Sequence, residues 1–199
     1  MISLALFAKP PLLGLVKTRL IPEIGAGKAA RVYLFCLEHA LALTQHCGLD
    51  YQIYLSQDSD DELFRHERYN IQKGADLGAR MLHAFAELIN GKSKGAIIIG
   101  SDCLDLTVGH IQAAAQALTD HELVLLPALD GGYALIGCSH ADPELLRDVA
   151  WSTDQVLAQT LANAKRLNYR VCLLETVRDI DTLQDLEQYP ELVALITSS

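Results

Sequence analysis

A basic segment with one glycine lies near the start of the chain, at residues 9–20 (KPPLLGLVKTRL), directly after a short apolar run. Gly14 allows the backbone to approach a ligand closely, and Lys17 and Arg19 supply positive charge. The guanidinium can bind a phosphate through two parallel hydrogen bonds, and Lys9 could meet the same anion. These four residues predict a binding site for the phosphates of a nucleotide. A solvated basic loop with Arg19 in a salt bridge is the alternative.

An aspartate follows the apolar run AIII, in the segment Gly100-Ser101-Asp102. Mg²⁺ and Mn²⁺ favour sites with few carboxylates, completed by phosphate oxygens and water. We therefore predict Asp102 as a ligand of Mg²⁺ or Mn²⁺. We assign Asp105, in the same loop, to capping of the helix that follows.

Two carboxylates lie two residues apart in Asp179-Ile180-Asp181. In an extended chain, side chains two residues apart point to the same side, so Asp179 and Asp181 could share one cation with Asp102. Capping of the next helix by Asp181 remains an open alternative.

A turn signal stands at Asp130-Gly131-Gly132-Tyr133. Glycines there permit a sharp turn and the close approach of a substrate to the backbone, which predicts an acceptor-binding role for these four residues. A simple turn before a strand is the alternative.

Two glycines, an amide and an arginine stand at a predicted helix start in residues 72–81 (QKGADLGARM). Gln72 and Gly78 are our candidates for contacts to a nucleotide, since an amide can read a base edge. An ordinary loop with Asp76 as N-cap is the alternative. In the later segment WST, we assign Trp151 to the core, with the wall of a pocket as the alternative, and Ser152 to a helix cap.

These candidate residues must be positioned by alternating strands and helices. Apolar runs and helical periodicity predict strands at 2–8, 51–55, 95–100, 123–126, 133–137 and 171–174, and helices at 27–46, 58–67, 76–89, 107–118, 153–167, 182–188 and 190–196. Such alternation predicts an α/β fold, with a mostly parallel sheet covered by helices on both faces. Ligands bind such sheets outside the carboxyl ends of the strands, where the loops described above begin.

Length and composition narrow the function classes. With 199 residues and no linker-like segment, we expect one domain over 1–199. The net charge of −9 excludes long nucleic acids and anionic membranes as partners, but not small polyanions. Five cysteines without a CxxC pair indicate free thiols in a reducing cytoplasm. We expect no membrane-spanning segment, and the sequence leaves the oligomeric state open.

The order of the segments FAKPPLLGLVKTRL, QKGADLGARM, IGSDC, PALDGGYALIG, WST and DIDT resembles that of the radical-SAM/selenodomain-associated transferases, a GT-A-like family. That family is related to 2-phospho-lactate guanylyltransferase and to molybdenum-cofactor nucleotidyltransferases. The resemblance runs from about Leu4 to Leu186. It implies a three-layer α/β/α sandwich of the GT-A, or nucleotide-diphospho-sugar transferase, type.

The resemblance also implies roles for single residues. They are phosphate contacts for Lys17 and Arg19, base or ribose contacts for Gln72 and Gly78, a metal pair for Asp102 and Asp181, and the acceptor side for Gly131 and Gly132. Relatives usually carry proline after the Asp-Cys pair, whereas this chain has Leu104. That departure puts the rigidity of the metal loop in question.

We therefore predict a metal-dependent transferase that acts on a nucleotide or nucleotide-sugar and a small acceptor, by nucleotidyl or glycosyl transfer. Lys17, Arg19 and Asp102 are the candidate catalytic residues. A catalytically idle nucleotide sensor with the same fold is the alternative. A P-loop NTPase does not fit, because only two residues separate Gly14 from Lys17-Thr18, whereas that motif is GxxxxGK[ST].

Overall fold

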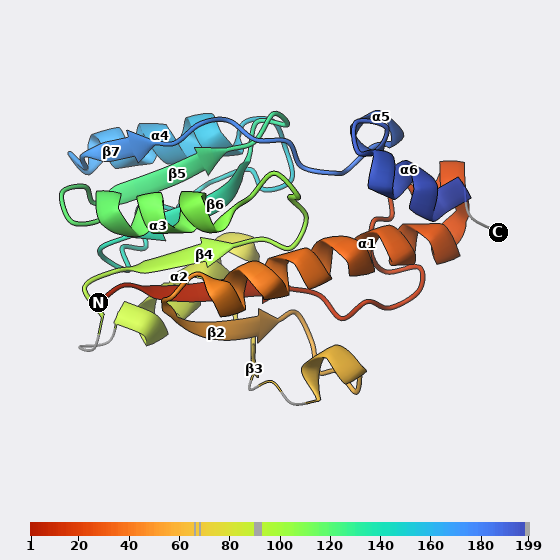
Figure 1. The fold of residues 1–199 in the computed structure, drawn as a ribbon. Helices are drawn as coiled ribbons and strands as arrows, with labels where there is room; N and C mark the ends of the chain where they lie inside the picture. Colours follow the sequence, from red (N-terminus) through yellow and green to blue (C-terminus); the bar gives the residue numbers. More distant parts are fainter. Residues whose placement is uncertain (66, 68, 90–92, 198–199) are drawn as a thin grey trace.

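The computed structural model describes residues 1–65, 67, 69–89 and 93–197. Seven strands form one sheet: β1 (Ser3–Ala8), β2 (Asp50–Leu55), β3 (Tyr69–Ile71), β4 (Ala96–Ile99), β5 (Leu123–Pro127), β6 (Tyr133–Cys138) and β7 (Val171–Leu173). The helices are α1 (Ile21–His46), α2 (Leu77–Ile89), α3 (Val108–Ala117), α4 (Val156–Arg166), α5 (Leu183–Leu186) and α6 (Pro190–Thr197), with a 3₁₀ turn η1 at Glu62–Phe64. Figure 1 shows how these elements are arranged.

The sheet has the strand order β3-β2-β1-β4-β6-β5-β7, and only β6 runs antiparallel to its neighbours β4 and β5. The short turn between β5 and β6 explains this reversal, because five residues cannot carry the chain back for a parallel pairing. The parallel pairs include β1 with β2 and β4, and β5 with β7. The prediction of a mostly parallel sheet is confirmed.

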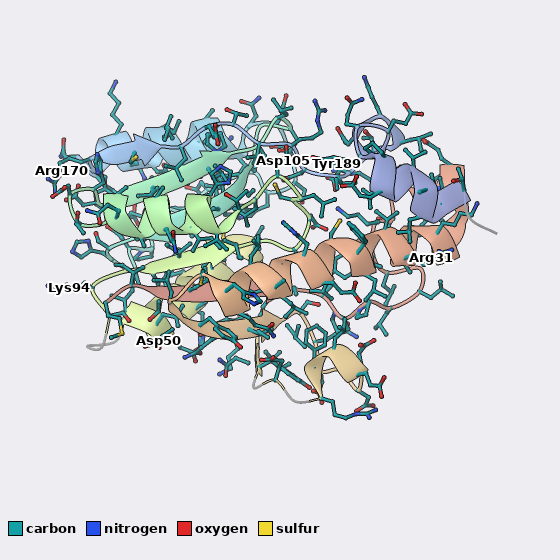
Figure 2. All side chains as sticks on the ribbon, viewed as in Figure 1. Arg31, Asp50, Lys94, Asp105, Arg170 and Tyr189 are labelled. Carbon is teal, nitrogen blue, oxygen red and sulfur yellow. The ribbon has the colours of Figure 1, made fainter. Side chains whose placement is uncertain are left out.

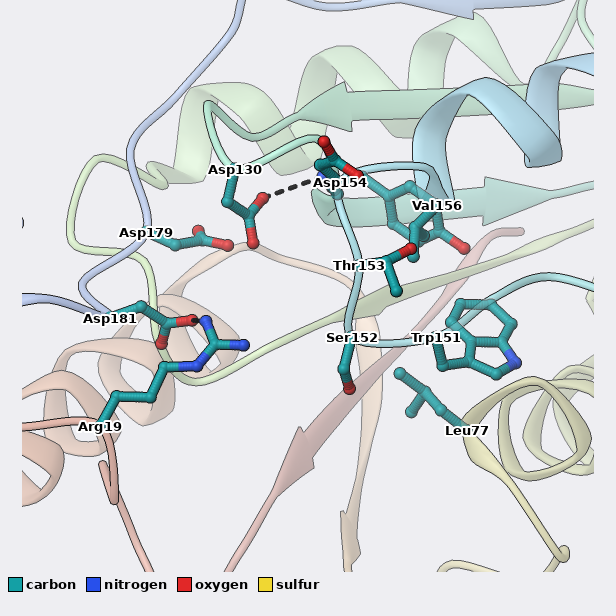
Figure 3. A pocket seen from close by; sticks show the side chains of 12 residues that line it. Arg19, Leu77, Asp130, Trp151, Ser152, Thr153, Asp154, Val156, Asp179 and Asp181 are labelled. Carbon is teal, nitrogen blue, oxygen red and sulfur yellow. Dashed lines mark hydrogen bonds and ion pairs between the residues drawn. The ribbon is translucent and has the colours of Figure 1, made fainter.

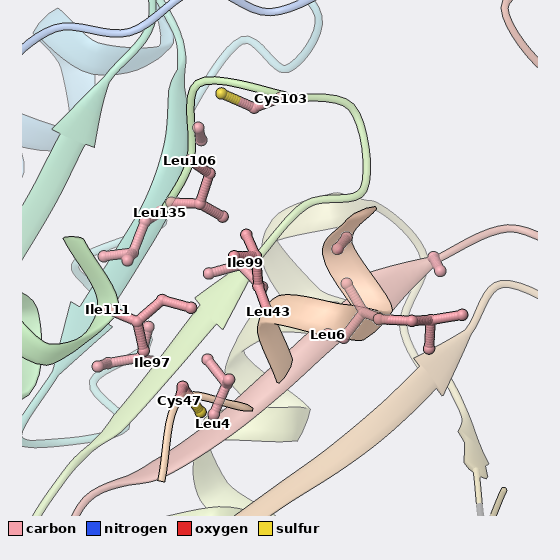
Figure 4. Close-up of a cluster of buried hydrophobic side chains, with 14 of the residues drawn as sticks. Leu4, Leu6, Leu43, Cys47, Ile97, Ile99, Cys103, Leu106, Ile111 and Leu135 are labelled. Atoms are coloured by element: carbon pink, nitrogen blue, oxygen red, sulfur yellow. The ribbon is translucent and has the colours of Figure 1, made fainter. Parts of the chain in front are cut away.

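Two apolar clusters cover the two faces of the sheet. Strand side chains alternate between the faces, so Leu4 and Leu6 lie in one cluster and Ala5 and Phe7 in the other. The first cluster, drawn in Figure 4, includes residues of α1 and α3 such as Leu43 and Ile111. The second includes residues of α2 and α4. Since the strands are buried on both faces, the fold is the expected three-layer sandwich.

The structure and the sequence expectation differ most at three of the predicted helices. The helix predicted at 58–67 is only the 3₁₀ turn η1, capped by Asp61, and residue 66 of that range lies outside the described residues. Helix α1 begins at Ile21 rather than at residue 27, with a non-helical Gly25 (φ 81°) close to its start. Helix α4 begins at Val156 rather than at residue 153, with Gln155 at its N-cap position.

The loops that carry the candidate residues leave the sheet at one edge. Segments 9–20, 100–107 and 174–182 follow the carboxyl ends of β1, β4 and β7, and the turn at 128–132 follows β5. All of these strands run in the same direction, so the loops gather at the end where the arrows of Figure 1 point. Among the helices in the described part of the chain, none combines the length and the apolar character needed to cross a bilayer.

Candidate functional site

Lys17 joins three of these loops. Its Nζ lies 2.8 Å from Asp102 Oδ1 and 3.5 Å from Asp181 Oδ1, and it donates a hydrogen bond to the backbone oxygen of Ile180. Only 3% of the lysine side chain is exposed. Lys17 itself takes a left-handed backbone conformation, with φ 46°, which is uncommon for a residue with a side chain. The structure thus places three predicted site residues in direct contact.

The charge on Lys17 is stabilised by its surroundings. Burial alone would lower the pKa of the ammonium, but the nearby carboxylates of Asp102 and Asp181 act in the opposite direction. The net effect raises the pKa of Lys17 above its ordinary value, so the ammonium stays charged at physiological pH. A fixed positive charge therefore lies between two carboxylates that we predicted as metal ligands.

Asp181 forms an ion pair with the basic loop and does not cap a helix. Its Oδ2 lies 2.8 Å from Arg19 Nη1, in an ion pair. The cap of α5 is Thr182, whose hydroxyl accepts a hydrogen bond from the Asp185 amide, and the Asp185 carboxylate accepts in return from the Thr182 amide. The alternative in which Asp181 caps this helix is thus wrong.

Asp179 carries a buried carboxylate. Its Oδ1 is buried and has no hydrogen-bond partner among the described residues. Burial, and then the charges of Asp130 and Asp102, raise the pKa of Asp179 to about 7, although Lys17 lowers it. A buried polar atom without a partner costs stability and often marks a functional position. Several carboxylates therefore share a small region that holds too little positive charge for them.

Asp102, Asp179 and Asp181 are the side chains predicted to hold a divalent cation. In the conformation described, no three His, Cys, Asp or Glu side chains of residues 1–65, 67, 69–89 and 93–197 are arranged to hold a metal ion. Asp102 and Asp181 both contact Lys17 instead. However, Mg²⁺ commonly takes only one or two carboxylates, with substrate phosphates and water as its other ligands. Asp102 and Asp181 would therefore need other ligands, such as phosphate oxygens, to complete the coordination of such a cation.

The loop after β4 is fixed by contacts with the segment around residue 180. Asp105 accepts hydrogen bonds from the Arg178 amide (3.1 Å) and from the Tyr189 hydroxyl (2.9 Å). Figure 2 labels Asp105 and Tyr189. It does not cap α3, because Thr107 forms a capping box with His110. Our assignment of Asp105 to capping is therefore wrong.

Leu104, which stands where relatives carry proline, packs against an apolar cluster that contains Leu20 and Ile180. The Ile180 amide donates to the backbone oxygen of Asp102 at 3.2 Å. Apolar packing and cross-loop hydrogen bonds thus hold this loop in place without the proline ring.

A cavity of about 420 Å³, which we call the basic cavity, opens between the ends of β1, β2 and β4. It is lined by Phe7, Ala8, Lys9, Tyr33, Ser56, Gln72, Leu77, Arg80, Gly100, Ser101, Asp102 and Ser152. Two cations, Lys9 and Arg80, stand against one carboxylate in this lining. The Gln72 amide nitrogen donates to the backbone oxygens of Ala8 and Tyr54, which leaves its carbonyl oxygen without a partner among the described residues.

A second cavity, of about 300 Å³, adjoins the first, and we call it the acidic cavity (Figure 3). Its lining consists of Arg19, Leu77, Asp130, Gly132, Tyr133, Trp151, Ser152, Thr153, Asp154, Val156, Asp179 and Asp181. Leu77 and Ser152 line both cavities, so the two form one cleft along the sheet edge. Figure 3 shows Asp130 and Asp179 close together, with the Arg19–Asp181 pair beside them.

Glycines shape the acidic cavity. Gly131 has φ 87°, and a Cβ at this position would overlap the backbone of Asp154. The Asp130 carboxylate accepts a hydrogen bond from the Gly132 amide at 2.9 Å, which fixes the turn. Of the four predicted acceptor residues, Asp130, Gly132 and Tyr133 line the cavity, while Gly131 lies behind them.

Three of the predicted nucleotide contacts, Lys17, Gly78 and Gly14, lie outside both linings. Gly78 packs against Trp151, where a Cβ would come within 2.7 Å of the indole Cζ2, and Gly14 lies in the exposed loop after β1 with φ 80°. Contact of either glycine with a nucleotide stays a prediction. The alternative role of Asp76 is borne out by geometry, since it accepts from the Ala79 amide at the start of α2.

Residues 151–153 play a larger part in the site than the sequence indicated. Trp151 packs partly into the core, as expected, and also forms a wall of the acidic cavity, which was the alternative. Ser152 caps no helix; its left-handed backbone places it between the two cavities, and Thr153 accepts from the Gln155 amide instead. A lone tryptophan followed by two hydroxyl residues was the available signal.

A protein-family model matches residues 37–153, more than half of the chain, and its family is described as "Uncharacterized protein conserved in bacteria (DUF2064)". The chain belongs to the DUF2064 family. A search of curated proteins gave no match. For a DUF2064 chain, solved structures are therefore the more informative comparison.

One similar structure is that of a candidate nucleotide-diphospho-sugar transferase from Desulfovibrio desulfuricans G20, with 27% identity, a TM-score of 0.89, and coverage of 98% of this chain and 96% of that one. Two others share the fold at low identity. The 4-diphosphocytidyl-2C-methyl-D-erythritol synthase of Anaerococcus prevotii DSM 20548 is 11% identical, and the inositol-1-phosphate CTP transferase of T. maritima is 10% identical. For each, the TM-score is 0.59 and the coverage is 98% of this chain and 94% of that one. This DUF2064 chain thus has the nucleotide-diphospho-sugar transferase fold.

Proposed function

We propose that the protein is a transferase that moves a group from a nucleotide or nucleotide-sugar to a small acceptor. One observation carries the proposal: a basic and an acidic cavity adjoin, next to the cluster of Lys17, Asp102 and Asp181. A donor with several phosphates fits the cavity with excess positive charge, and an acceptor fits its neighbour.

The similarity to nucleotide-diphospho-sugar transferases and nucleotidyltransferases supports this proposal. The order of the motifs, which resembles that of the radical-SAM/selenodomain-associated transferases, supports it as well. All five cysteines are free thiols, four of them buried, which suits our placement of the protein in the cytoplasm.

In this proposal, Lys9 and Arg80 attract the donor phosphates into the basic cavity, and Gln72 offers its carbonyl oxygen to the base or ribose. Lys17 and Arg19 lie where phosphates would reach the carboxylate cluster, so they would stabilise the charge that develops on the leaving group. Asp102, Asp181 and Asp179 would hold Mg²⁺ or Mn²⁺. A cation held there would neutralise part of the charge on the phosphates.

Two reactions fit this arrangement. In glycosyl transfer, an acceptor oxygen bonds to the anomeric carbon, and the nucleoside diphosphate leaves with the electron pair of the broken bond. In nucleotidyl transfer, the acceptor oxygen bonds to the α-phosphorus and pyrophosphate leaves with the electron pair. In both, an acceptor hydroxyl would lose its proton to solvent, while the chain contributes mainly positioning and charge.

Phosphorus NMR tests the proposal directly. The protein is mixed with Mg²⁺, either GTP or UDP-glucose, and candidate acceptors. Acceptor-dependent appearance of free nucleoside diphosphate indicates glycosyl transfer, and pyrophosphate indicates nucleotidyl transfer. If calorimetry detects metal-dependent nucleotide binding but no acceptor yields a product, the sensor alternative gains support. If no nucleotide binds with either metal, the proposal fails.

A further inference from the structure

We propose that the acidic cavity selects an acceptor with uncharged hydroxyl groups, a small sugar or polyol, and discriminates against acceptors that carry a phosphate. This inference rests on the proposed function, because it assigns a chemical class to the second substrate of the transferase. It is carried by the charge, the hydrogen-bonding groups and the shape of the lining.

The charge of the lining disfavours an anion. Asp130 and Asp154 take part in no ion pair among the described residues, whereas Asp181 pairs with Arg19 and Asp179 is one of the proposed metal ligands. An acceptor phosphate would have to enter beside two carboxylates that lack a cationic partner. The one guanidinium in this lining could receive it only by giving up its own carboxylate.

The hydrogen-bonding groups of the lining favour a ligand that donates hydrogen bonds. An ionised carboxylate only accepts hydrogen bonds, a phosphate does the same, and a hydroxyl can donate. Asp130 uses Oδ1 for the Gly132 amide, which leaves its Oδ2 without a hydrogen-bond partner among the described residues. A hydroxyl group could donate to this oxygen of Asp130, whereas a phosphate oxygen could not.

The apolar part of the lining fits the other face of a sugar ring. Trp151 forms one wall together with Leu77 and Val156. The C–H groups of a sugar or polyol can pack on such a surface while its hydroxyls face the acids. A cavity of about 300 Å³ also lies at the small end of ligand sites, which suits a compact acceptor.

The adjoining basic cavity completes the contrast. Its two cations, Lys9 and Arg80, face a single carboxylate, so phosphates are better held there. The cleft therefore separates an anionic donor from an uncharged acceptor by charge alone. In either of the two reactions proposed above, this division favours a hydroxyl group over a phosphate group as the acceptor.

Fluorescence offers a local test, because Trp151 is the only tryptophan of the chain and lines the acidic cavity. The whole protein is titrated at constant ionic strength with matched pairs: glycerol and glycerol 3-phosphate, then glucose and glucose 1-phosphate. We expect at least one uncharged member to change the Trp151 emission with an apparent affinity about tenfold higher than that of its phosphate ester.

Two isosteric variants separate the charge of the cavity from the charge of the protein. Asp130→Asn keeps the oxygen that accepts from Gly132 and removes the charge. We expect it to strengthen binding of the phosphate ester by about threefold or more and to change binding of the uncharged partner by less than about twofold. Asp50→Asn makes the same charge change at the amino end of β2, away from the cleft, and should leave both affinities unaltered.

Three results would overturn the inference: a phosphate ester that binds as tightly as its uncharged partner, binding of neither member of any pair, or an equal effect of the two variants. Donor binding is measured separately by calorimetry with UDP-glucose and Mn²⁺. Donor binding together with a preference for phosphate esters contradicts only this inference. The expected acceptor preference without any donor binding contradicts only the proposed function.

Discussion

Lys17 Nζ lies 2.8 Å from Asp102 Oδ1, so the basic loop after β1 and the acidic loop after β4 are joined by an ion pair. The lysine is almost completely buried, whereas Asp102 is about half exposed. The ion pair therefore lies at the bottom of the cleft. In our proposal, the phosphates and the cation would bind at this position.

Replacing Lys17 with methionine should destabilise the protein. Methionine fills much of the same volume, but Asp102 and Asp181 lose the ammonium between them. Because Asp102 is partly exposed, we expect a loss of about 1–3 kcal/mol, below the range for fully buried pairs. Chemical denaturation measures it. The Asp50→Asn variant serves as the surface control, and equal stability of the Lys17 variant and the wild type would contradict this reading of the pair.

Removing either predicted metal ligand should abolish metal-dependent nucleotide binding. Asp102→Ala and Asp181→Ala each delete one carboxylate of the cluster, so the cation would lose one of its three proposed carboxylate ligands. Calorimetry with Mn²⁺ and a panel of nucleotides is the measurement. Wild-type affinity in both variants, or affinity that does not depend on the metal, would rule out the proposed metal site.

Asp179→Asn should stabilise the metal-free protein at about pH 8, where the carboxyl group is mostly ionised. The crowded carboxylate carries a raised pKa, so its charge works against folding above that pKa. We expect the melting temperature, measured by calorimetry in the presence of a chelator, to rise by about 2–4 °C. A lower melting temperature in the variant would mean that the ionised carboxylate makes a favourable contact.

Gly131→Ala should destabilise the turn of the acidic cavity, because φ is positive and the added methyl overlaps the backbone of Asp154. We expect a loss of about 1–3 kcal/mol of unfolding free energy. Gly27→Ala is the matched control: Gly27 lies in α1, and a Cβ there meets no atom within 4 Å, so this variant should be neutral or slightly stabilising. If both variants unfold alike, the close approach at Gly131 carries no energetic weight.

The pH dependence of stability should include the pair of Glu122 and Arg170. Hydrogen bonds from Arg170 lower the pKa of Glu122 to about 2. A carboxyl group with a lowered pKa in the folded state stabilises the protein above its unfolded pKa, and this stabilisation is lost as the pH falls toward about 2. Glu122→Gln should therefore lower the melting temperature at pH 7, and the difference should shrink toward pH 3.

Glu144→Gln is the comparison for this pH experiment. Glu144 forms an exposed ion pair with Arg147, three residues further along the chain. Exposed ion pairs contribute little to stability. Its melting temperature should follow that of the wild type at each pH. If the deficit of the Glu122 variant did not diminish on acidification, a cause other than the charge of Glu122 would be required.

The sequence by itself determined the layered α/β fold and the edge at which the site lies. Continuous apolar runs such as 4–8 and 96–99 are typical of central strands that are buried on both faces, and helical spacing in 77–89 indicates a covering helix. The residue types before each helix were a less reliable guide to which residue caps it. Asp61, Asp76 and Thr107 cap the elements that they precede, but Asp105, Asp181 and Ser152 do not.

Only the tertiary structure decided which charges meet. Lys17 and Asp181 are separated by 164 positions, and no local periodicity shows that the loop after β1 folds against the segment after β7. The same holds for the two cavities, since Trp151, Asp130 and Asp179 come from three different connections. Long-range packing of the sheet brings these loops to one edge, and the resulting balance of charge, rather than any single motif, separates a basic cavity from an acidic one.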